Sequence, residues 1–133
     1  MKFKKEDLIK LYVNMVRAEA YDQWLTRKSL TGEMKATYHP VWGDYAAGVA
    51  GCTFLKPDDV IYPHHRGHGL PHLIGKGVEI RRFIADQFGK ATGSCNGFGT
   101  MAHQIIQRWE YTVQAARWEP LLSSPRVGDW RPR

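Results

Sequence analysis

Apolar residues recur at helical spacing near the start of the chain, and acidic residues precede them. The apolar positions that share one helix face are Leu8, Leu11, Tyr12, Met15 and Val16. Glu6 and Asp7 favour the first turn of a helix through its dipole, so the pattern predicts a helix that continues to about Arg27. Because the same face turns polar at Glu19 and Asp22, we expect the second half of this helix to pack differently from the first.

Small residues dominate the segment from Gly43 to Leu55, which we expect to form a second helix. A glycine costs about 1 kcal/mol relative to alanine in an exposed helix. Glycines are therefore better explained in a packed helix, where the missing side chain lets another backbone approach. This helix should therefore lie very close to its neighbours.

The next part of the chain alternates between turn signals and short apolar patterns. Residues 56–59 read Lys-Pro-Asp-Asp, a turn signal, and the β-forming residues 60–62 predict a buried strand. A polar loop, 63–69, follows the strand. The apolar spacing over 80–88 predicts an amphipathic helix, and the glycines of 89–99 predict a flexible loop.

The composition changes after His103. Residues 104–133 contain three tryptophans, five arginines and three prolines but no lysine, whereas the first 103 residues contain nine lysines. We therefore divide the chain into a domain portion, 1–103, and a tail, 104–133. In the tail we expect a helix from about Gln104 to Trp118 and a disordered end.

Composition narrows the class of protein. A length of 133 residues allows one domain or a piece of a larger one, and the net charge of +6 suggests anionic partners. Cys52 and Cys95 lack CxxC spacing, which disfavours a disulfide framework and a cysteine zinc site. The sequence has no signal-peptide pattern and no run of about 20 apolar residues. We expect a soluble, cytoplasmic protein without membrane partners.

The densest group of chemically active side chains is His-His-Arg-Gly-His-Gly at 64–69, with His72 close behind. Histidines four residues apart could bind a metal on one helix face, but the glycines and Pro71 disfavour that helix and no carboxylate lies nearby. Alternatively, the glycines expose backbone amides and Arg66 offers a planar fork that matches phosphate. A solvated polar loop is the third interpretation, and composition alone does not separate it from the anion site.

Two other features carry weaker signals. The glycine loop at 93–100 matches neither the P-loop nor the dinucleotide-binding pattern. His39 is an isolated histidine beside Pro40, a type of residue that is more often structural than catalytic. The tryptophans and arginines of the tail could stack on bases, which leaves a small basic nucleic-acid-binding module as an alternative function.

The order and spacing of these segments resemble the α subunits of the thiamine-diphosphate-dependent pyruvate, acetoin and branched-chain 2-oxo acid dehydrogenases. The segments that carry the resemblance are Phe54-Leu55-Lys56-Pro57-Asp58-Asp59, Val60-Ile61-Tyr62, His65-Arg66-Gly67-His68-Gly69, Phe88-Gly89-Lys90-Ala91-Thr92-Gly93 and the glycine loop ending in His103. The resemblance covers roughly residues 5–103. It implies an α/β fold: the amino-terminal portion of a thiamine-diphosphate-binding fold, helix-rich with few strands and incomplete.

The resemblance also implies a reaction and a set of site residues. The reaction is oxidative decarboxylation of a 2-oxo acid with acyl transfer to a lipoyl disulfide. His65 and Arg66 would bind the diphosphate end of thiamine diphosphate, whose partner ion is magnesium. His68 would face the active site, and His39, four residues before Gly43, would be a second active-site histidine near the substrate or the lipoyl group. The implied partners are a β-type subunit and a lipoyl-bearing component, in an oligomer.

Two departures of the chain from the family pattern bear on its chemistry. Gly43-Asp44-Tyr45-Ala46 replaces a Gly-Gln-Glu-Ala segment, and Gly128-Asp129-Trp130 does not match the Gly-Asp-Gly motif that carries magnesium in the family. We therefore expect no metal ligands here, a truncated or frame-shifted chain that is inactive alone, and a tail outside the resemblance. A non-catalytic protein that pairs with a β-type subunit is a further alternative; nucleic-acid binding is the less favoured one.

Overall fold

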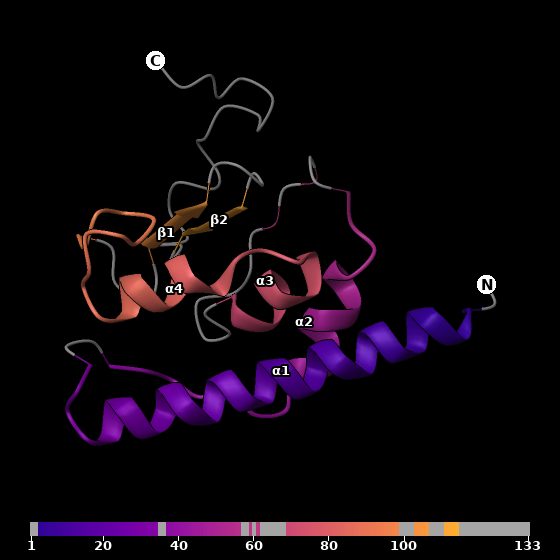
Figure 1. Cartoon of the computed structure of the whole chain (residues 1–133), viewed down its shortest axis with the longest axis horizontal. Helices are drawn as coiled ribbons and strands as arrows, with labels where there is room; N and C mark the ends of the chain where they lie inside the picture. The colour runs from indigo at the N-terminus through magenta and orange to yellow at the C-terminus, as the bar shows by residue number, and fades with distance from the viewer. Residues whose placement is uncertain are drawn as a thin grey trace, which may run out of the picture.

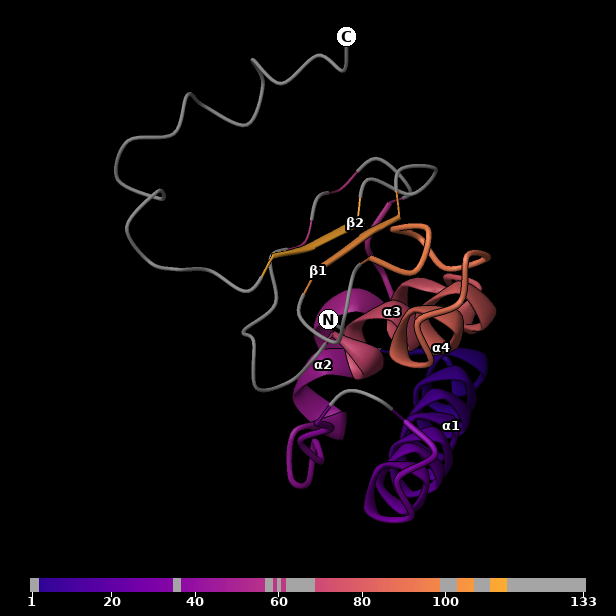
Figure 2. The same cartoon turned by 90° about the vertical axis from the view of Figure 1, so that its left-hand side faces the viewer.

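The computed structural model describes residues 3–34, 37–56, 59, 61 and 69–98 in full, together with the backbone of 103–106 and 111–114. The helices are α1 (Lys5–Leu30), α2 (Tyr45–Cys52), α3 (Leu70–Lys76) and α4 (Ile80–Gln87), and the strands are β1 (His103–Ile106) and β2 (Tyr111–Gln114). In Figure 1, α1 runs along one side of the molecule while α2, α3 and α4 lie above it. Figure 2 shows β1 and β2 on the side of α3 that faces away from α1.

The first helix begins and ends where its local sequence indicates. The backbone N–H of Lys4 donates to the Asp7 carboxylate at 3.1 Å, so an acidic residue of the first turn caps the start of the helix. Arg27 and Lys28 occupy the last turn, where positive charge complements the helix dipole. The Thr31 N–H donates back to the Arg27 carbonyl at 3.0 Å. The predicted first helix is confirmed and runs three residues past Arg27, to Leu30.

The core lies between α1 and the other three helices. Its fully buried apolar side chains include Ala18, Leu25, Val49, Leu70, Leu73 and Phe83. The two halves of α1 do pack differently, because Ala18 and Leu25 in the second half are buried whereas Leu8 and Tyr12 in the first half are exposed. Trp24 extends the packing by meeting Phe88, at the end of α4, with ring centroids 5.8 Å apart.

The second and third helices approach each other closely at one glycine on each helix. A Cβ atom on Gly48 would lie 2.7 Å from the Pro71 Cβ, and one on Gly75 would lie 2.8 Å from the Val49 carbonyl oxygen. Any larger residue would therefore push α2 and α3 apart. The expectation of a small-residue helix lying close to its neighbours is confirmed, with narrower bounds than 43–55.

The third helix did not follow from the sequence pattern. Pro71 and the glycines around it indicate a break, yet Pro71 stands in the first turn of α3, where a missing N–H costs nothing. Gly69 and Gly77, at φ +68° and +80°, bound the helix on either side. Glycine readily adopts such left-handed conformations, so one glycine can stand directly before the helix and another directly after it.

The helix expected over 104–118 is wrong for the residues described there. Residues 103–106 and 111–114 form an antiparallel pair in which His103 faces Gln114 and Ile106 faces Tyr111. Isoleucine, tyrosine, threonine and valine fill most of these positions, and such side chains favour strands. Of the strand expected over 60–62, only Ile61 is described, as a single bridge residue, and 60 and 62 lie outside the described residues.

The described part of the chain is thus helix-rich with one small sheet, as expected for a fragment with few strands. None of its helices combines the length and the apolar character needed to cross a membrane.

Candidate functional site

A buried carboxylate in the middle of α1 anchors the segment that contains His39. Asp22 is fully buried, and its Oδ1 accepts hydrogen bonds from the Tyr38 hydroxyl at 2.6 Å and the Val41 N–H at 3.0 Å. Its Oδ2 accepts from the Tyr45 hydroxyl at 2.6 Å. A buried carboxylate is costly unless its oxygens are satisfied. The three hydrogen bonds satisfy both oxygens of Asp22 and fix residues 38–45 to α1.

The two tyrosines of this cluster are held in their protonated form. Burial, followed by the hydrogen bond to Asp22, raises the pKa of Tyr38 well above its usual value. The same causes, in the same order, raise the pKa of Tyr45. Ionising either hydroxyl would place a second negative charge beside the carboxylate and remove a donor. Both tyrosines therefore act as hydrogen-bond donors at all physiological pH values.

His39 lies between two of these anchor points. Tyr38 and Val41 on either side are both fixed to Asp22, while His39 itself is exposed. The Tyr38 N–H also meets the Ser29 hydroxyl at 3.3 Å, which fixes the segment to the end of α1. The structure thus presents the predicted histidine at the surface from a backbone that is anchored on both sides.

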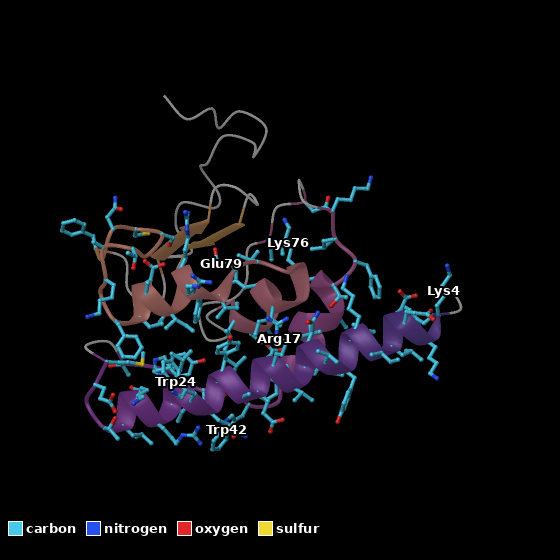
Figure 3. The ribbon with its side chains drawn as sticks, in the orientation of Figure 1. Lys4, Arg17, Trp24, Trp42, Lys76 and Glu79 are labelled. Atoms are coloured by element: carbon cyan, nitrogen blue, oxygen red, sulfur yellow. The ribbon has the colours of Figure 1, made fainter. Side chains whose placement is uncertain are left out.

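An open hollow lies next to this segment. It has a volume of about 450 Å³ and is bounded by Glu19, Gln23 and Arg27 of α1 and by Trp42. Trp42 is 74% exposed, and in Figure 3 it lies on the side of α1 away from α3. Tryptophan and arginine are enriched at the centres of protein interfaces, so this side of the His39 segment has the composition of a contact surface.

A second buried aspartate organises the glycine-rich loop after α4. Asp86 Oδ2 accepts from the N–H and the hydroxyl of Ser94 at 3.0 and 2.5 Å, and Oδ1 accepts from the Cys95 N–H at 3.2 Å. A Cβ on Gly93 would come within 2.0 Å of Asp86 Oδ1, so a glycine is required there. The amides of Ser94 and Cys95 therefore donate to an internal carboxylate, which leaves these two groups unavailable to a phosphate.

Three of the four predicted site residues, His65, Arg66 and His68, lie outside the described residues. In the sequence they fall between Ile61 and Gly69, the residue directly before α3. Imidazole and guanidinium donors, as at 65 and 66, suit the diphosphate of the implied cofactor. Within the part of the chain that is described, no group of three or more His, Cys, Asp or Glu side chains could hold a metal ion.

His72, three residues after Gly69, lies where its charged form is disfavoured. Burial lowers its pKa, against a smaller opposing effect of Asp44. Its buried Nδ1 has no hydrogen-bond partner among the described residues and lies against α2, where a Cβ on Gly48 would be 3.1 Å away. His72 is thus a neutral residue of the α2–α3 contact.

Sequence reasoning missed the two aspartates. A signal was present for each, because Asp22 falls four residues after Ala18 and three before Leu25, on the buried side of α1. Asp86 likewise falls three residues after buried Phe83. An acidic residue at a buried helical position needs donors, although the spacing does not tell which donors supply them.

Comparison with known proteins identifies α subunits that are similar to this chain. No family model and no solved structure matches the chain. The alpha subunits of acetoin:2,6-dichlorophenolindophenol oxidoreductase from Bacillus subtilis and Cupriavidus necator are 32% and 35% identical over 99 residues, which is 74% of this chain. The chloroplastic pyruvate dehydrogenase E1 component subunit alpha-3 of Oryza sativa is 30% identical over 103 residues, 77% of the chain. The resemblance to 2-oxo acid dehydrogenase α subunits is confirmed.

These relatives are much longer than the chain. It spans 29% of the two acetoin α subunits and 24% of the pyruvate dehydrogenase α subunit, in their amino-terminal part. A mitochondrial 2-oxoisovalerate dehydrogenase subunit alpha 2 from Arabidopsis thaliana is 25% identical over 112 residues. The similarity therefore extends across α subunits named for three different substrates, but only to a fragment of each.

Proposed function

We propose that the chain forms the amino-terminal portion of the α subunit of a thiamine-diphosphate-dependent 2-oxo acid dehydrogenase, with the corresponding part of that α/β fold. The observation that carries the proposal is the similarity to α subunits over 74% of the chain. The reaction is oxidative decarboxylation of a 2-oxo acid with transfer of the acyl group to a lipoyl disulfide. Thiamine diphosphate with magnesium supplies the carbanion chemistry when bound.

The residues of this chain would bind and orient. Arg66 would present two parallel N–H groups to a phosphate, and His65 would add a donor. His39 and His68 would hold or move a proton near the substrate, because histidine changes charge near neutral pH. Asp22 supports this role indirectly: by anchoring both sides of His39 it fixes the position from which the imidazole acts.

The remainder of the enzyme must come from outside this chain. Magnesium ligands would come from sequence that the relatives have in addition, and a β-type subunit and a lipoyl-bearing component would complete the catalytic assembly. We therefore propose that the chain alone is inactive. Within the described part of the chain, the buried Cys52 is a free thiol, which is consistent with a reducing compartment such as the cytoplasm.

Calorimetric titration with thiamine diphosphate and magnesium tests the proposal. The chain should bind the cofactor, and Arg66→Ala should weaken binding by about tenfold or more, as expected for losing a charge-assisted hydrogen bond. Arg81→Ala is the matched control. It removes an equally charged guanidinium that is exposed and that pairs with Glu79 at 3.2 Å, so this variant should bind the cofactor like the original chain.

Two outcomes would contradict the proposal. A folded chain that binds no cofactor but co-purifies with a β-type subunit would make it a non-catalytic interaction protein. Equal loss of binding in Arg66→Ala and Arg81→Ala would indicate nonspecific attraction to the net positive charge. In that case binding should also fall steeply with salt, as it does for a basic nucleic-acid-binding module.

A further inference from the structure

The first half of α1 carries an apolar surface that no described element covers. The side chains of this α1 stripe are between 45% and 65% exposed, and they are Leu8, Ile9, Tyr12, Val13 and Val16. They are exposed because α2 and α3 pack on the opposite side of α1, where Asn14 and Ala18 are buried. In Figure 1 this half of α1 lies at the edge of the molecule, with its lower side open.

The stripe is more than scattered surface apolar residues. Its positions follow helical spacing over more than two turns, so they form one continuous face. Phe3 is nearby but already has a partner, because its ring stacks on Phe54 at 5.8 Å. A contiguous apolar face on a helix marks a surface that binds another chain.

Opposite charges stand at the two ends of the stripe. Lys5 precedes it and Glu19 follows it, and both side chains are exposed. At 100° per residue, both fall within the arc of the helix that the stripe occupies. Tyr12 lies midway between them, seven residues from each, and also midway between Leu8 and Val16. The face is therefore self-complementary about Tyr12.

We propose that a second copy of this chain covers the α1 stripe. Two α1 helices would pack antiparallel across a twofold axis at Tyr12, so that Lys5 of each faces Glu19 of the other and Leu8 faces Val16. A twofold axis makes one patch bind itself, and each favourable contact then occurs twice. This surface is separate from the residues of the proposed catalytic role, and the inference goes beyond that role.

The charges also select against other arrangements. A parallel pair would place Lys5 beside Lys5 and Glu19 beside Glu19, which is unfavourable.

Sedimentation equilibrium of the full 133-residue chain over a range of concentrations tests the proposal. The chain should show a monomer–dimer equilibrium. Lys5→Glu and Glu19→Lys should each weaken dimerisation by about tenfold, because each variant turns two attractive pairs into repulsive ones. The double variant, Lys5→Glu with Glu19→Lys, should restore the original dimerisation constant. These side chains are exposed, so the fold is not at stake.

Two matched glutamate substitutions, one inside the stripe and one outside it, distinguish association through the stripe from nonspecific hydrophobic association. Tyr12→Glu places two like charges at the twofold axis and should abolish the dimer. Leu30→Glu, at an 82% exposed leucine outside the stripe, should leave it unchanged. The proposal is overturned by a chain that stays monomeric, by a double charge exchange that fails to restore association, or by Leu30→Glu acting like Tyr12→Glu. A monomer captured only by a β-type subunit would assign the stripe to that partner.

Discussion

The Tyr45 hydroxyl donates to the Asp22 carboxylate at 2.6 Å, although the two residues are 23 positions apart in the chain. Tyr45 is the first residue of α2 and Asp22 lies in the second half of α1. This single hydrogen bond fixes where α2 starts relative to α1. With the Tyr38 hydroxyl and the Val41 N–H on the same carboxylate, it also determines the path of the segment that presents His39.

Replacing the central carboxylate should destabilise the fold. Asp22→Asn keeps the shape but loses the charge that three donors share, so the free energy of unfolding should fall by about 2–3 kcal/mol. Urea denaturation followed by circular dichroism measures this loss. Glu33→Gln is the control, since that carboxylate is exposed at the surface and its pair with Lys28 at 2.7 Å should contribute little to stability. Equal losses in the two variants would count against the cluster as an anchor.

The tyrosines of the cluster predict a loss of stability in alkaline solution. Their pKa values are raised above the ordinary value of 10.0 in the folded state. The unfolded chain therefore releases protons first, and stability should fall as the pH rises above about 10. Unfolding in urea at several pH values from 8 to 11 should show this slope. The variant with Tyr38→Phe and Tyr45→Phe should show a shallower slope, together with a lower stability at pH 8.

Two glycines near the α2–α3 contact should respond to alanine in opposite ways. Gly75→Ala should be destabilising, because its Cβ would lie 2.8 Å from the Val49 carbonyl oxygen and separate the helices. Gly51→Ala should stabilise the protein by up to about 1 kcal/mol, since nothing lies within 4 Å of its Cβ position and alanine favours helix. Thermal unfolding of both variants checks the pair. A stabilising Gly75→Ala would mean that α2 and α3 are not in close contact.

The two cysteines should differ in reactivity. Burial raises the pKa of the Cys52 thiol to about 11, against a smaller opposing effect of Lys76. Because the thiolate is the reactive form, Cys52 should be modified slowly by a thiol reagent at pH 8 in the native protein. The more accessible Cys95 should react first. The rates should become similar in urea, and Cys52→Ser should remove only the slow phase. A fast native reaction at Cys52 would contradict its burial.

Some elements could be predicted because their signals are local. The acidic start, the helical apolar spacing and the basic last turn of α1 lie within the helix itself. The amphipathic spacing of α4 is equally local, and its predicted range of 80–88 agrees with the observed Ile80–Gln87. The segment at 103–114 was mistaken for a helix because strand pairing depends on a partner strand, which composition does not display.

The sequence by itself determined which segments become the main helices, that α2 consists mainly of small residues, and which family the chain resembles. Only the tertiary structure decided which side of α1 is buried, that α3 begins beside Pro71, and that Asp22 and Asp86 organise the two loops. The physical reason is range. Helix propensity, capping and turn preferences depend on residues a few positions apart, whereas burial and the satisfaction of a buried carboxylate depend on groups that only folding brings together.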